Sequence, residues 1–203
     1  MRSCVLVFIL LALLEESSCA NVLFVNGIPS PSHHHYNRVF VLGLATKGHN
    51  VTFLSVDLVK KEIKNDVHYI HLEKTYEFIF HGDEPVNLLD VAAQGTVESI
   101  TAMPDFCLAV CHGALMSSGL DSLLNYPKDF KFDVLIYDFT FGPCLLPLLH
   151  KFNYPPLILV SAFANPPYTT DYVGGHKYPS YMGNYTAAET FKNITTLQLV
   201  FKF

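Results

Sequence analysis

The feature that most constrains the fold is a series of short apolar runs that alternate with longer segments of helical pattern. Each run is too short for an ordinary helix and is rich in valine, isoleucine, leucine or phenylalanine, as buried strands are. The runs are 21–26 (NVLFVN), 51–55 (VTFLS), 67–72 (VHYIHL), 132–138 (FDVLIYD) and 156–160 (PLILV). Helices are predicted over 32–48, 58–64, most of 83–125, 143–152 and 187–203. Strands that alternate with helices predict an α/β fold, a parallel sheet with helices on its faces.

Composition sets the size of this fold and excludes one class of partner. The chain has 203 residues, half of them hydrophobic, which is enough for one core of ordinary domain size. Its formal charge is −5 and it has no basic run, so nothing points to nucleic acid as a partner.

The first twenty residues have the pattern of a secretory signal peptide. Arg2 precedes the apolar run 4–14 (CVLVFILLALL), and small residues lead up to Ala20, after which cleavage is expected. A membrane anchor is the alternative, but the run is too short to span and two glutamates follow it. We therefore predict a signal peptide at 1–20, a domain at 21–203, and residence in the lumen of the secretory pathway.

The glycosylation acceptors and cysteines bear on the same compartment. The N-x-T pattern occurs at Asn50, Asn184 and Asn193. Asn50 opens an apolar strand and is predicted to lie too close to the core for modification, which leaves Asn184 and Asn193 as candidates.

Cys107, Cys111 and Cys144 remain after cleavage, an odd number that cannot all pair. Because Cys107 and Cys111 lie at i, i+4 in an apolar helix, we interpret them as small core residues rather than metal ligands.

Three consecutive histidines, His33, His34 and His35, begin the first predicted helix, with Ser32 as its N-cap. Successive helical residues point about 100° apart, so the three rings cannot converge on one metal ion. His33 shares a face with Asn37, Phe40 and Leu44, and the two apolar residues place that face toward the core. His34 and His35 are predicted to face solvent.

His33 is the candidate general base. It directly follows the first strand, and ligands of open parallel sheets bind beyond the carboxyl ends of the strands. The positive end of the helix favours a neutral imidazole, as a base requires. The alternative is an ordinary histidine at a helix entry.

A base needs a partner that orients its other ring nitrogen. Asp133 enters the fourth strand at its amino end, whereas Asp138 leaves it at the carboxyl end, the edge where His33 lies. Asp138 is not expected to cap the following helix, because Pro143 suits its first position. We predict that Asp138 hydrogen-bonds His33, the alternative being an ordinary loop aspartate.

These residues resemble a known family. The "SH" at 32–33, "GHNVTFLS" at 48–55, "FDVLIYDFTFGPC" at 132–144 and "YPSYMGNYT" at 178–186 are together similar to the N-terminal, acceptor-binding domain of the UDP-glycosyltransferases, which include the glucuronosyltransferases of animals. The resemblance implies a Rossmann-like domain that is the N-terminal half of a GT-B fold. It also implies residence in the endoplasmic reticulum and a role in detoxification.

The resemblance implies a reaction as well. The family's catalytic histidine corresponds to His33 and its supporting aspartate to Asp138. A hydroxyl of a small lipophilic acceptor would attack a UDP-sugar with inversion, transferring a hexosyl or glucuronosyl group, with no metal and no other cofactor. Ser32 and, more weakly, Phe106 are candidate substrate contacts, and Leu108 and Met116 could line the same pocket.

The sequence departs from the family in lacking its donor-binding domain, any tryptophan and a C-terminal membrane helix. We therefore expect this polypeptide alone to be inactive, with a membrane anchor only in a longer product. One alternative is a non-catalytic lumenal module that binds hydrophobic ligands or associates with other family members. A serine hydrolase is disfavoured because no G-x-S-x-G elbow occurs.

Overall fold

The computed structural model describes residues 19–57, 67–79, 96–162 and 174. Its five strands are β1 (Asn21–Asn26), β2 (Asn50–Ser55), β3 (Val67–His71), β4 (Val134–Asp138) and β5 (Leu157–Val160). Its helices are α2 (Pro31–Thr46), α3 (Thr75–Ile79), α5 (Thr96–Leu115), α6 (Ser118–Leu124) and α7 (Leu148–Lys151), with a 3₁₀ turn, η1 (Phe139–Phe141), after β4. Each of the five apolar runs forms a strand, as predicted.

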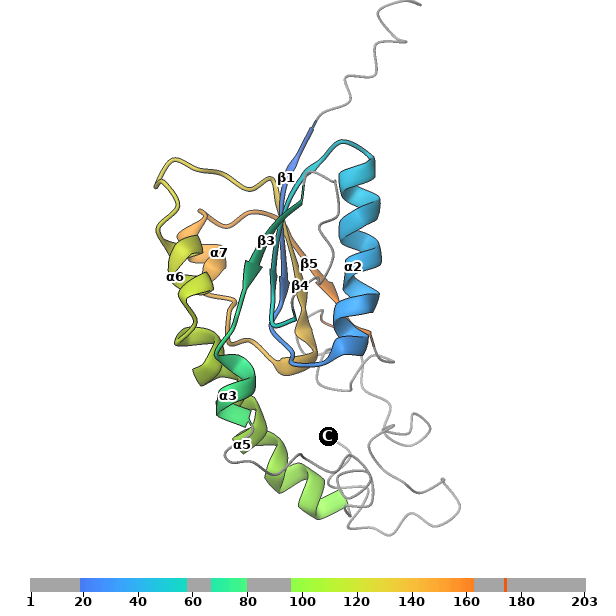
Figure 1. The fold of residues 1–203 in the computed structure, drawn as a ribbon, viewed down its shortest axis with the longest axis vertical. Coiled ribbons are helices and arrows are strands. Elements are labelled where there is room, and N and C mark those ends of the chain that lie inside the picture. Colours follow the sequence, from blue (N-terminus) through green and yellow to red (C-terminus); the bar gives the residue numbers. More distant parts are fainter. Residues whose placement is uncertain (1–18, 58–66, 80–95, 163–173, 175–203) are drawn as a thin grey trace, which may run out of the picture.

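The strands form one parallel sheet in the order β3-β2-β1-β4-β5. This is the order of a Rossmann-like fold, with β1 at the centre between β2 and β4. Figure 1 shows α2 on one side of the sheet and α6 and α7 on the other. The prediction of a Rossmann-like parallel sheet with flanking helices is confirmed.

The alternation of side chains along β1 divides the core into two layers. Val22 and Phe24 pack toward α2, against Val41 of that helix. Leu23 and Val25 point to the opposite face, where they join residues of α5, α6 and α7. Both faces of β1 are therefore buried, which explains its nearly continuous apolar sequence.

Helix α2 is rotated relative to the prediction. The residues that it buries are His33, His34, Asn37, Val41 and Ala45. Phe40, predicted to face the core, is 44% exposed, and its ring packs edge-on against Tyr36. His34, predicted to face solvent, is 4% exposed. The face through Asn37 and Val41 packs on the sheet. The predictions that Phe40 faces the core and that His34 faces solvent were therefore wrong.

The cysteine interpretation was wrong for one residue of the pair. Cys111 of α5 forms a disulfide with Cys144, which follows β4, and the two are 33 residues apart. Cys107, one helical turn before Cys111, is a half-buried free thiol. The disulfide ties α5 to the segment that leaves the carboxyl end of β4.

Three further predictions need local correction. The helix predicted from Pro143 to Phe152 is shorter, because a bend at 143 and turns at 144–147 come before α7. Ser30, rather than Ser32, is at the N-cap of α2. Asn50 is exposed, and its Nδ2 donates a hydrogen bond to Asn21 Oδ1 at 3.1 Å, so it does not lie in the core.

Several predictions lie outside the described residues: most of the signal peptide, the helices at 58–64 and 187–203, and the acceptors Asn184 and Asn193. Within the described ranges, no single helix is long and apolar enough to span a membrane. The bent pair Pro104–Leu115 and Ser118–Leu124, with 62° between its members, meets the length and composition criteria only when taken together.

Candidate active site

The topology of the sheet places a switch point beside its central strand. The strand order reverses at β1, between β2 and β4. Helix α2 leaves the carboxyl end of β1, and η1 leaves the carboxyl end of β4. Side chains that follow these two strands meet at the topological switch point, where ligands of open α/β sheets bind.

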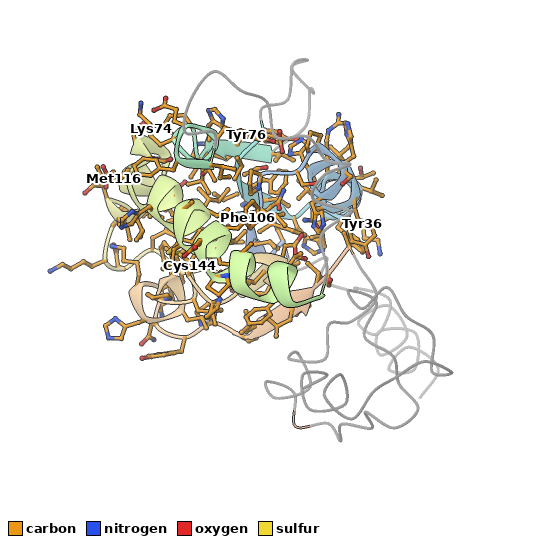
Figure 2. All side chains as sticks on the ribbon, turned by 90° about the horizontal axis from the view of Figure 1, so that it is seen from below. Tyr36, Lys74, Tyr76, Phe106, Met116 and Cys144 are labelled. Carbon is orange, nitrogen blue, oxygen red and sulfur yellow. A yellow bond between two sulfur atoms is a disulfide. The ribbon has the colours of Figure 1, made fainter. Side chains whose placement is uncertain are left out.

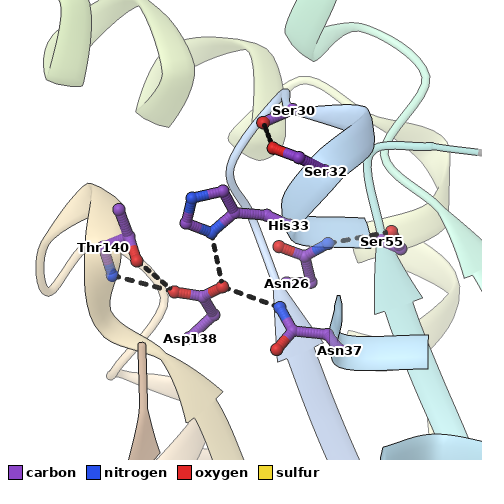
Figure 3. A network of polar contacts seen from close by, with 8 residues as sticks. All are labelled: Asn26, Ser30, Ser32, His33, Asn37, Ser55, Asp138 and Thr140. Atoms are coloured by element: carbon purple, nitrogen blue, oxygen red, sulfur yellow. Dashed lines mark hydrogen bonds and ion pairs between the residues drawn. The ribbon is translucent and has the colours of Figure 1, made fainter. Parts of the chain in front are cut away.

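His33 and Asp138 meet at this switch point. His33 Nδ1 lies 3.0 Å from Asp138 Oδ2, although the two residues are 105 positions apart in the sequence. Both side chains are buried, with 1% of His33 and 0% of Asp138 exposed. The predicted contact between these residues is confirmed, and Figure 3 shows the ring and the carboxylate facing each other.

The Asp138 carboxylate accepts four hydrogen bonds, two at each oxygen. Oδ2 accepts from His33 and from Asn37 Nδ2, the latter at 2.7 Å. Oδ1 accepts from the backbone N–H of Thr140 at 3.0 Å and from its hydroxyl at 2.5 Å. These contacts fix the carboxylate in one orientation (Figure 3).

This environment sets the charge of Asp138. Burial alone raises the pKa of the carboxyl, but hydrogen bonds from His33, Thr140 and Asn37 outweigh it and lower the pKa below its usual value. Asp138 is therefore ionised at neutral pH and can only accept hydrogen bonds.

An acceptor-only partner fixes the tautomer of His33. Nδ1 must carry the hydrogen that it donates to Asp138, so in the neutral ring the lone pair is on Nε2. A neutral imidazole with its Nδ1–H held by a carboxylate is the arrangement of a general base that is oriented through its second nitrogen.

Two residues that brace Asp138 were not predicted to do so. Asn37 follows His33 by four residues, a spacing that predicts a shared helix face but not the hydrogen bond from Asn37 to Asp138. Thr140 follows Asp138 by two residues, the spacing of an Asx turn. Through this contact Asp138 caps the short turn η1, and the N-cap of α7 is Pro147, so Asp138 does not cap the helix that follows.

The predicted substrate contacts come from two elements, the start of α2 and α5. Ser32 is exposed, and its hydroxyl is 2.9 Å from that of Ser30, beside His33 in Figure 3. Phe106 lies on α5, which passes below the carboxyl ends of the strands in Figure 1 and in front of them in Figure 2. It is 37% exposed, and Leu108 on the same helix and Met116, the residue directly after that helix, are more exposed still. The roles of Ser32 and Phe106 as substrate contacts stay predictions.

A second polar cluster adjoins the first on the β2 side. His34 Nδ1 is 2.9 Å from Ser55 Oγ, at the carboxyl end of β2. Ser55 Oγ also accepts two hydrogen bonds of 3.4 Å, one from Nδ2 of Asn26 at the end of β1 and one from the backbone N–H of Asp57. Burial lowers the pKa of His34, and nearby Asp57 opposes this only in part. His34 is therefore neutral at neutral pH.

Residues that could hold a metal ion do not cluster in the described ranges. No group of three or more His, Cys, Asp or Glu side chains with that potential occurs among residues 19–57, 67–79 and 96–162. The acidic and imidazole groups at the switch point bond to each other and to amide and hydroxyl donors instead.

Comparisons with known proteins give one kind of match. No protein-family model matches the chain, and no curated protein does. Three chains of solved structures match, among them the crystal structure of TcCGT1 in complex with UDP, at 17% identity and a TM-score of 0.38. That alignment covers 77% of this chain and 31% of the neighbour, so this chain spans about a third of the neighbour's length.

Proposed function

We propose that the chain carries the acceptor-side half of a UDP-glycosyltransferase, with His33 as general base and Asp138 as the residue that orients it. The observation that carries this proposal is the buried contact of 3.0 Å between His33 Nδ1 and Asp138 Oδ2 at the switch point of the sheet. The sequence motifs supply the substrate class, a UDP-sugar and a small lipophilic alcohol or phenol. A second, C-terminal domain would supply most contacts to the donor.

The chemistry follows from the tautomer. The acceptor hydroxyl gives its proton to His33 Nε2 while its oxygen forms a bond to the anomeric carbon of the sugar. The bond between that carbon and the diphosphate breaks with its electron pair, and UDP leaves as the anion. Attack from the face opposite to the leaving group inverts the anomeric configuration.

Asp138 stabilises the transient imidazolium. The carboxylate is ionised and held by four hydrogen bonds, so it meets the developing positive charge on His33 without moving. Proton transfer to a placed base contributes about 10²–10⁴ in rate, and positioning of the two substrates must supply the remainder.

The test is turnover by the complete product of the gene, expressed in a host with a secretory pathway. UDP release is measured with a panel of UDP-sugars and lipophilic phenols, for the wild type and for His33→Ala, Asp138→Asn and His35→Ala. His33→Ala should lower kcat/KM by about 10²–10⁴. The exposed neighbour His35 is the matched control, and its variant should stay within about twofold of the wild type.

Two results would contradict the proposal. Turnover that survives His33→Ala at the wild-type rate would remove His33 from its role. Tight binding of lipophilic compounds with no turnover of any UDP-sugar by the complete product would favour the lumenal binding module instead.

A further inference from the structure

The first turn of α2 is attached to two different strands by two adjacent side chains. His33 bonds to Asp138 at the end of β4, and His34 bonds to Ser55 at the end of β2. Because β1 lies between β2 and β4, the two rings reach outward from the central strand in opposite directions. The angle of about 100° between successive helical side chains makes this possible.

The hydrogen positions around Ser55 follow from its other partners. The backbone N–H of Asp57 can only donate, and Asn26 donates through its amide nitrogen, so both use acceptor positions of the Ser55 oxygen. The hydroxyl hydrogen of Ser55 is left for Nδ1 of His34. A neutral His34 that accepts at Nδ1 carries its own hydrogen on Nε2.

The neighbouring histidines are thus held in opposite tautomers. His33 donates from Nδ1 to a carboxylate, and His34 accepts at Nδ1 from a hydroxyl. We propose that His34 is a positioning residue which, with Ser55, sets the rotation of the first turn of α2 so that the Nδ1–H of His33 points at Asp138. This deepens the proposed function and rests on it only in treating His33 as the base.

Packing alone does not account for His34. Its ring stacks on Phe53, with centroids 5.5 Å apart and planes at 24°, and a phenyl ring could make the same contact. Burying an imidazole instead requires that its polar nitrogen be satisfied, as Ser55 does here. The two roles can be separated, because His34→Phe keeps the stacking and removes only the hydrogen bond.

The test is NMR of the full chain labelled with ¹⁵N-histidine, which reports the protonated nitrogen of each ring. Signals of His33 and His34, among ten histidines, are assigned by their loss in His33→Gln and His34→Phe. In the wild type we expect His33 protonated at Nδ1 and His34 at Nε2. A wild-type His34 protonated at Nδ1 would overturn the proposal without the use of any variant of Ser55.

The positioning role is read from the exchange of the His33 Nδ1–H with water. Ser55→Ala and His34→Phe should each accelerate this exchange about five- to tenfold, the effect of one lost net hydrogen bond. Ser55→Thr, which keeps the hydroxyl, and the exposed His35→Ala should leave it unchanged. The backbone amide of Phe24, in the middle of β1, serves as the reference for global stability.

Unchanged exchange in both variants would show that His34 only packs. Equal acceleration at His33 and at Phe24 would show a general loss of stability and would equally overturn the positioning role. No activity is measured, so failure here is distinguishable from failure of the proposed glycosyl transfer.

Discussion

Asp138→Asn is the sharpest test of how the site is built. An amide replaces one carboxylate oxygen by an NH₂ group, and each oxygen of Asp138 accepts two hydrogen bonds. If the NH₂ group faces Thr140 it opposes two donors, and two bonds to a charged group are lost. If it faces His33 and Asn37 it is accepted only when the ring changes tautomer and the Asn37 amide turns over, and the remaining bonds then lose the charge. At about 1.5–3 kcal/mol for each bond to a charged group, the free energy of unfolding should fall by about 3–6 kcal/mol at neutral pH.

The pH dependence gives this prediction a second part. The pKa of Asp138 is lower in the folded protein than its ordinary value, so the carboxylate stabilises the fold above that ordinary value. The contribution is lost as the pH falls below about 4 and through the folded pKa. The variant lacks this titration, so the gap between it and the wild type should narrow toward acid.

Unfolding in urea, followed by far-UV circular dichroism because the chain has no tryptophan, measures both effects. The matched control is Asp133→Asn at the exposed amino end of the same segment, where a backbone N–H is the donor to the carboxylate. We expect a change of about 0.5 kcal/mol or less in the control. A neutral-pH loss of less than about 1 kcal/mol for Asp138→Asn would refute the four-bond account of this carboxylate.

The same unfolding measurement checks three further predictions. Asn37→Leu removes a buried donor to the charged site and should cost about 1.5–3 kcal/mol; a loss within error would mean that the amide is dispensable. Cys111→Ser opens a loop of 33 residues and should cost about 3–4 kcal/mol. Cys107→Ser, which replaces the free thiol, should have the stability of the wild type. Equal losses of stability in Cys111→Ser and Cys107→Ser would contradict the disulfide between Cys111 and Cys144. Gly119→Ala would drive a Cβ into the backbone of β3 and should cost about 1–3 kcal/mol. The Cβ of Gly43→Ala meets open space on α2, so this variant should be more stable than the wild type by up to about 1 kcal/mol. A Gly119→Ala variant more stable than Gly43→Ala would contradict the packing described.

The parallel sheet and the contact of His33 with Asp138 could be predicted because both depend on local pattern and one rule of topology. Short apolar runs specify the strands, and carboxyl ends of parallel strands share an edge. The orientation of α2 could not be predicted, because Phe40 is more apolar than the Asn37 and His34 that the fold buries. Hydrogen bonds, which the apolar pattern does not record, make that burial favourable. The partner of Cys111 likewise depends on tertiary contact rather than on cysteine spacing.

The polar groups at the switch point also discriminate between arrangements of the sheet. His33 finds its partner only if β4 lies on one side of β1, and His34 only if β2 lies on the other. In a misfolded sheet with these two neighbours exchanged, the Asp138 carboxylate would lose its hydrogen bonds from His33 and Asn37, at about 1.5–3 kcal/mol each. The cluster therefore penalises a wrong strand order, so the groups proposed for catalysis also help the chain to select its native topology.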